Sequence, residues 1–149
     1  MKPINSTSQH GSFFVAMAFL LLLLLSIAAL GIDLGLYYYR DLQLQNLADG
    51  AVKAGAQALN QSTKQIETSR VRSAVRRYLI QSPRSADFLD RSQLDNGIIV
   101  DARVDDQGDT VYRIGVSLVS SFQPVTVPTE VFGYSKFTLV ANSLLRARV

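Results

Sequence analysis

An unbroken apolar run near the start of the chain limits what it can fold into more than any other feature. Residues Phe13 to Ile32, FFVAMAFLLLLLLSIAALGI, contain no charged side chain. About 20 apolar residues in a helix span the ~30 Å hydrocarbon core of a bilayer. We therefore predict a transmembrane helix over 13–32, a cytoplasmic tail over 1–12, and a domain outside the cytoplasm over 33–149.

A cleaved secretory signal is the rival interpretation of this run. The run is longer than the usual signal core of about 7 to 15 residues, and the helical pattern continues beyond it. Ala28, Ala29 and Gly31 nevertheless leave a cleavage site open. Because Lys2 precedes the run and the charges soon after it nearly cancel, we choose an N-terminus inside and a domain outside.

The helical pattern continues from Asp33 to Asn60 with an amphipathic character, which predicts one rod of up to about 70 Å. At 100° per residue, one broad face is apolar or small and the opposite face is polar. The apolar face holds Leu34, Tyr37, Leu44, Leu47, Ala48, Ala51, Val52, Ala54, Gly55, Ala58 and Leu59, and the polar face holds Asn46, Asp49, Lys53, Gln57 and Asn60.

Small side chains dominate the outer half of that apolar face. We predict helix packing at Ala48, Ala51, Ala54, Gly55 and Ala58. Their small-x-x-x-small spacing lets another backbone approach closely, and close packing would compensate the roughly 1 kcal/mol that a glycine costs inside a helix. Whether this face packs on the protein's own sheet or on another subunit stays open.

Three charges fall on the apolar side of the wheel, directly after the span. Asp33 and Arg40 lie two turns apart, close enough in angle to pair with each other or with a neighbour, and Asp41 follows. The favoured interpretation is that water and lipid headgroups satisfy these charges, beside an interfacial aromatic belt over 37–39.

The same stretch resembles the N-terminal module of TadE/TadG-like proteins of the bacterial Tad (Flp) pilus assembly system. The resemblance covers about residues 11–60 and combines an apolar span, a D-x-G turn and an alanine-rich helix, although Gly50 and Lys53 depart from the alanine-rich run. The matching motif residues are Asp33, Gly35, Tyr38, Arg40, Leu44, Gln45, Asn46 and Asp49.

The resemblance implies a single-pass protein of the bacterial inner membrane with its C-terminal domain in the periplasm. Its partners would be the lipid bilayer and other Tad assembly proteins or pilins, with homo- or hetero-oligomers left open. Whether it enters the pilus or belongs to the envelope machine is also open. Prepilin-type processing would cut after Gly11, but Ala16 stands where an acidic residue is typical, so we expect no efficient cut.

A second helix follows in the sequence. Ser62 to Gln65 has the Ser-x-x-Gln capping spacing, and an apolar stripe from Ile66 to Leu79 ends before Pro83. Its basic residues are Arg70, Arg72, Arg76 and Arg77. We expect them to face solvent, with anionic headgroups as the alternative. No nucleic-acid partner is expected, since the net charge of +3 comes from basic residues scattered among acidic ones.

In the last third of the chain, apolar and polar residues alternate as they do in β-strands. Ile98 to Val104 and Thr110 to Val119 predict an antiparallel hairpin around the turn over 105–109, which we favour over a calcium loop. Pro124 and Pro128 bracket a loop, and Tyr134 to Arg148 predicts a third strand. The expected fold is α+β: the long helix, a second helix and a small antiparallel sheet of about three strands, a pilin-like plan by analogy.

The residues that usually perform catalysis are scarce. Cysteine is absent and the one histidine, His10, lies in the polar tail. We therefore expect no enzyme, no cofactor and no metal site; a catalytic site would need Asp87, Asp90 and Asp95 to meet in a buried pocket. A membrane-anchored periplasmic binding or sensory module is the alternative function.

Overall fold

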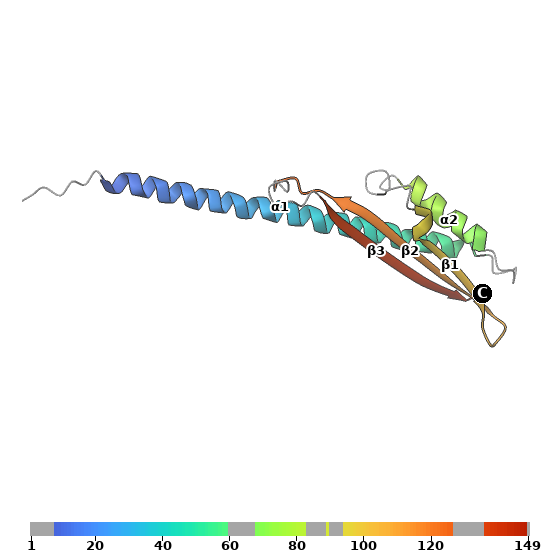
Figure 1. Ribbon diagram of the computed structural model, residues 1–149. Coiled ribbons are helices and arrows are strands. Elements are labelled where there is room, and N and C mark those ends of the chain that lie inside the picture. The colour runs from blue at the N-terminus through green and yellow to red at the C-terminus, as the bar shows by residue number, and fades with distance from the viewer. Residues whose placement is uncertain (1–7, 60–67, 83–88, 90–93, 127–135, 149) are drawn as a thin grey trace, which may run out of the picture.

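The described residues form one very long helix, two shorter helices and a three-stranded sheet (Figure 1). The computed structural model describes residues 8–59, 68–82, 89, 94–126 and 136–148. In chain order the elements are α1 (Ser8–Gln57), α2 (Thr68–Gln81), α4 (Leu94–Gly97), β1 (Ile98–Val104), β2 (Thr110–Phe122) and β3 (Phe137–Arg148). This confirms the predicted α+β class.

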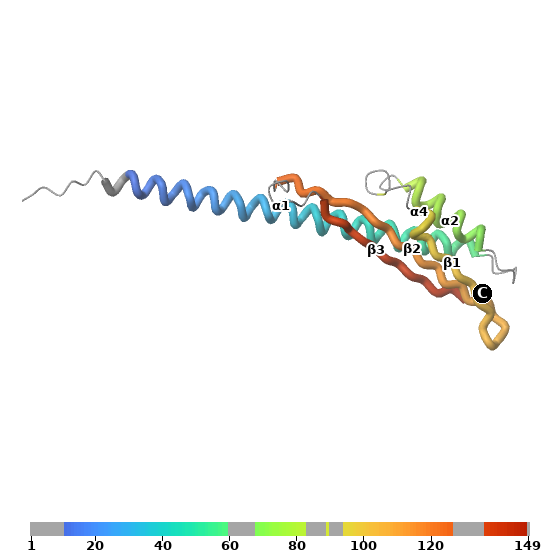
Figure 2. Tube along the Cα trace, viewed as in Figure 1, coloured from blue at the N-terminus to red at the C-terminus, as the bar shows by residue number. Residues whose placement is uncertain are grey.

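Helix α1 has two halves with different surroundings. Its 50 residues give a rod of about 75 Å. The first half stands away from the rest of the protein, and the sheet and α2 pack only on the second half (Figures 1 and 2). Side chains of the apolar run are exposed, as at Leu22 and Ile27. Among the described residues, α1 is the one helix long and apolar enough to cross a membrane.

The sheet is antiparallel, with strand order β1-β2-β3. Strand β2 runs three residues beyond the predicted end at Val119, because Ser120 and Phe122 continue the alternation of buried and exposed side chains. Phe122 pairs with Phe137 at one end, and Val111 pairs with Arg148 near the other. Tyr134, the predicted start of the third strand, and Pro128 lie outside the described residues.

The core lies between the outer half of α1, the inner face of the sheet and α2. The buried side chains of β2 follow its alternation, and Gly115 on the opposite face is buried as well. The side chains with the smallest exposed fractions are Leu44, Ala48, Ala51 and Val52 of α1, Val71, Val75 and Leu79 of α2, Ile114, Val116, Leu118 and Phe122 of β2, and Leu139 and Ala141 of β3. One continuous core therefore joins the second half of α1 to α2, α4 and the three strands.

The second helix forms as predicted from Thr68 onward, while its predicted cap over 62–65 lies outside the described residues. It packs over α1 with Tyr78 beside Gly50. Gly50 lies about 27 Å beyond Ile32 along the helix axis. If the bilayer ends near Ile32, the arginines of α2 lie more than one screening length, about 10 Å in 0.1 M salt, from its surface. Arg72 instead donates to the Asp95 carbonyl at 2.8 Å.

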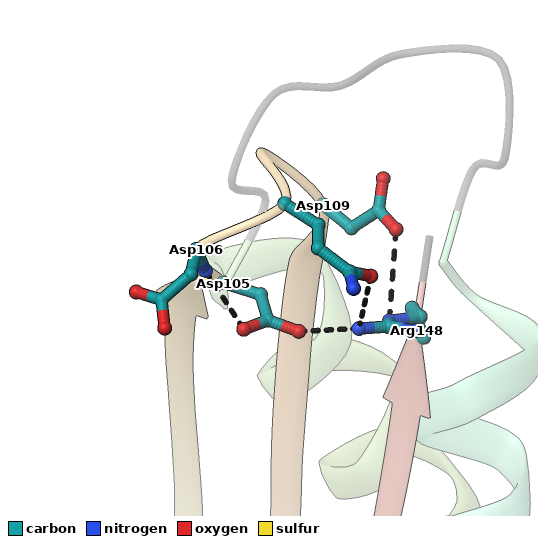
Figure 3. Close-up of polar contacts among 5 residues, drawn as sticks. Asp105, Asp106, Asp109 and Arg148 are labelled. Carbon is teal, nitrogen blue, oxygen red and sulfur yellow. Dashed lines mark hydrogen bonds and ion pairs between the residues drawn. The ribbon is translucent and has the colours of Figure 1, made fainter.

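The predicted hairpin turn joins β1 to β2. Gly108 has a φ of 83°, and the amide of Asp105 donates to the Asp109 carbonyl at 2.8 Å. The Arg148 guanidinium bonds the Asp105 carboxylate, lies 3.6 Å from an Asp109 oxygen and donates to Gln107 at 3.3 Å (Figure 3). The Arg148 hydrogen bond, and then that from the Asp106 amide, lower the pKa of Asp105 below 3.8.

The membrane-proximal helix as candidate functional site

The motif residues of α1 occupy the stretch where the helix leaves its free half and meets the sheet. Asp33 lies at the start of this stretch and Asp49 at its end. Some motif side chains contact the rest of the chain, and others point away from it. This division separates the residues that build the domain from those that remain accessible to another molecule.

Asp33 is buried, with 7 % of its surface exposed. Its Oδ1 accepts the amides of Val125 and Thr126 at 2.9 and 3.1 Å, and the Thr126 hydroxyl lies 2.5 Å from Oδ2. The structure thus differs from the favoured interpretation, in which water and headgroups satisfy this charge. The carboxylate instead ties α1 to the segment after β2, because backbone N–H groups satisfy a buried carboxylate well.

One turn further along α1, an aromatic contact holds the end of β2 against the helix. The rings of Tyr37 and Phe122 meet edge to face, with centroids 5.8 Å apart. The Arg40 guanidinium carbon lies 5.2 Å from the centroid of the same Phe122 ring. A cation over an aromatic face contributes about 0.5 to 2 kcal/mol, depending on how far it is desolvated. Arg40 therefore packs on the protein itself.

The second half of the motif attaches α1 to β3. Leu44 is buried in the core, with 1 % exposed. The Gln45 side-chain amide donates to the backbone carbonyl of Asn142 and to the Asp49 carboxylate, each at 3.2 Å. Asp49 thereby orients Gln45 toward the strand. This explains why a polar pair sits one turn apart beside an apolar stripe.

The remaining motif residues point away from the domain. Gly35 and Asn46 are exposed, and 64 % of Tyr38 is exposed. A Cβ placed on Gly35 or on Gly31 would meet nothing within 4 Å. Packing among the described residues therefore does not account for these two glycines inside the helix.

The small-residue face packs within the chain. Ala48 and Ala51 are fully buried, Gly55 is buried, and Ala54 and Ala58 are half-buried. A Cβ on Gly55 would lie 2.7 Å from a methyl of Val75 and 3.3 Å from one of Ile114. Of the two interpretations that the sequence left open, the structure has the face against its own α2 and β2.

Sequence reasoning missed the partners of these motif residues, Thr126, Phe122 and Asn142. They lie in or beside strands about 80 to 100 positions away, and periodicity describes only neighbours in the sequence. One signal was available: a lone acid directly after an apolar span needs donors, and the uncharged segment 123–126 offers free backbone amides.

The described residues offer little for catalysis. Among them, no cluster of three histidine, cysteine, aspartate or glutamate side chains could hold a metal ion. Asp95 is exposed and lies 3.5 Å from Arg76, while Asp87 and Asp90 lie outside the described residues. A shallow hollow of about 200 Å³ is lined by Leu89, Leu94, Asn96 and residues 97 and 117–119, which contain no charged side chain.

Fold and site together define an α+β protein with one apolar helix suited to membrane anchoring. Residues 11–58 match the family described as "Putative Flp pilus-assembly TadE/G-like". The N-terminal part of the chain is therefore similar to this family, in agreement with the resemblance seen in its motif. Comparisons with curated proteins and with solved structures gave no match.

Proposed function

We propose that the protein is a non-enzymatic, single-pass inner-membrane component of Tad (Flp) pilus assembly or of a related secretion apparatus. Its role is that of a minor pilin-like subunit or an assembly scaffold. The N-terminus lies in the cytoplasm and the domain over 33–149 lies in the periplasm, where it meets pilins or other assembly proteins.

The observation that carries this proposal is the overlap of the TadE/G-like match with α1. The matched residues comprise the whole apolar run and the helix on which the sheet is built. A long helix with a free apolar half and a sheet on its outer half is the pilin-like plan, by analogy of architecture. An assembly role uses such a helix as an anchor and as a contact surface.

The outward motif residues supply that contact surface. Gly35, Tyr38 and Asn46 belong to the motif but are exposed, so a neighbouring subunit can reach the Gly35 backbone and the side chains of Tyr38 and Asn46. The described residues bring no acid, base and nucleophile together in a pocket, which is consistent with a structural role.

Complementation of a deletion strain tests the proposal. Loss of the gene should abolish or reduce Flp-type pili seen by electron microscopy, and the wild-type gene should restore them. Tyr38→Ala should restore them poorly, whereas Tyr39→Ala, at a residue that is 60 % exposed but outside the motif, should restore them fully. Normal pili in the deletion strain would favour the alternative, a membrane-anchored binding or sensory module.

A further inference from the structure

We propose that the segment Gln123–Thr126, which follows β2, makes a second contact with the bilayer at the boundary between headgroups and acyl chains. This inference rests on the proposed membrane anchoring of α1 but not on a role in pili. The segment is uncharged, and its side chains are exposed except for the half-buried Pro124.

Hydrogen bonds place the segment beside the end of the apolar run. The Thr126 hydroxyl lies 2.8 Å from the carbonyl oxygen of Ala29. Ala29 belongs to the run, about 4.5 Å along the helix axis before its end at Ile32. If the run spans the bilayer, Thr126 lies at the level where the acyl chains begin.

The hydrogen bonds to Asp33 allow a non-helical backbone to lie at this level. In a lipid environment an unpaired N–H is costly, so irregular backbone enters only where its polar groups are satisfied. The Asp33 carboxylate accepts the amides of both Val125 and Thr126. An acid at the end of an apolar span thus has a physical purpose here.

The apolar side chains that are exposed at this level suit lipid better than water. Val125 is 71 % exposed, and Leu30, Ile32 and Leu34 of α1 are about half exposed at the same height, so they form one apolar belt. Lys136 is exposed just before β3, whose first residue pairs with the end of β2. A lysine at this end of the sheet can extend its ammonium group to headgroup phosphates while its apolar stem stays near the acyl chains.

A single tryptophan can report this contact, because the chain has none of its own. Val125→Trp in the full-length protein is reconstituted into phosphatidylglycerol–phosphatidylethanolamine vesicles, with and without lipid brominated near the top of the acyl chains. We expect a blue-shifted emission that is lost to the bromines. Val104→Trp is the matched control: its valine is 63 % exposed and lies at the far end of the sheet, so its emission should persist.

Phe19→Trp, within the apolar run, distinguishes failure of the second bilayer contact from failure of the membrane anchor. If Phe19→Trp is quenched by lipid brominated deep in the acyl chains while Val125→Trp behaves like Val104→Trp, the second contact does not exist but the anchor stands. If Phe19→Trp also escapes quenching, the helix is not in the bilayer and both proposals fall. Quenching at positions 19 and 125, but not at 104, supports the inference.

Discussion

The Asp33 carboxylate connects α1 to the segment that follows β2. Its position in α1 is set by the end of the apolar run, and its partners Val125 and Thr126 lie 92 and 93 residues later. Hydrogen bonds to a charged group contribute about 1.5 to 3 kcal/mol, more than neutral ones. The residue therefore fixes where the sheet begins along the helix, in addition to marking the end of the span.

Replacing this carboxylate by its neutral isostere should loosen the tie. Asp33→Asn keeps the shape but turns one acceptor into a donor that faces the Thr126 amide or hydroxyl, so we expect a loss of about 1.5 to 3 kcal/mol in the free energy of unfolding. Denaturant titration of the detergent-solubilised protein measures it. Asp41→Asn, a half-buried aspartate on the same helix, is the control. Equal effects at both positions would contradict the tie.

The hairpin cluster gives a prediction about pH. Because Arg148 lowers the pKa of Asp105, this pair contributes stability above the unfolded pKa and loses it as the pH falls through the lower folded value. Arg148→Ala should return the pKa of Asp105 toward 3.8. An NMR titration of its carboxyl carbon measures the change. Arg146→Ala removes a neighbouring arginine and should leave the pKa lowered; no difference between the variants would refute the assignment.

At the scale of elements, regular periodicity determined what the sequence could predict. The long helix, α2 and all three strands repeat their apolar residues, and each is present. The sequence predicts no helix at α4, because four residues carry no period. Contacts with the rest of the protein stabilise it: Leu94 is buried, and Arg72 donates a hydrogen bond to the Asp95 carbonyl. Gly97 ends it where a Cβ would lie 2.1 Å from the Ser117 carbonyl.

The candidate site was predictable only as a list of residues. Their spacing on α1 indicated a common stretch and the family resemblance selected them. The helical wheel put Asn46 on the polar face, where it is exposed, but nothing local showed that Gln45 contacts the sheet. That distinction depends on where β3 passes along the helix. Where a strand packs along a helix that is distant in sequence depends on tertiary packing. The periodicity of apolar residues within one element does not reveal it.

The glycines of α1 provide a test of packing at this scale. Gly55→Leu must displace Val75 and Ile114, and overpacking a core costs about 1 to 3 kcal/mol, so the variant should be degraded or accumulate poorly in immunoblots. Gly35→Leu, the same change on the same helix in open space, should accumulate normally. Normal accumulation of Gly55→Leu would mean that this face is not tightly packed.

At the scale of the whole molecule, the apolar run and the domain share one continuous helix. The helix runs through Gly11 without a break, so the residue is helical where prepilin-type processing would cut. Because Ala16 lacks the acid that is typical of processed relatives, we expect the chain to keep its residues before Ser12. Mass spectrometry of the membrane-extracted protein decides this, and a mature N-terminus at Ser12 would overturn it.

The continuous helix also makes the topology testable with reporters. A rigid rod that spans the bilayer over 13–32 places everything packed on its outer half on one side of the membrane, because the domain shares a single core. A reporter fused after Val149 should therefore be active only if it functions in the periplasm, and the same reporter fused before Met1 should be silent. Activity of a cytoplasmic reporter at Val149 would reverse the orientation. Release of the fusion as a soluble periplasmic product would show instead that the apolar run is a cleaved signal.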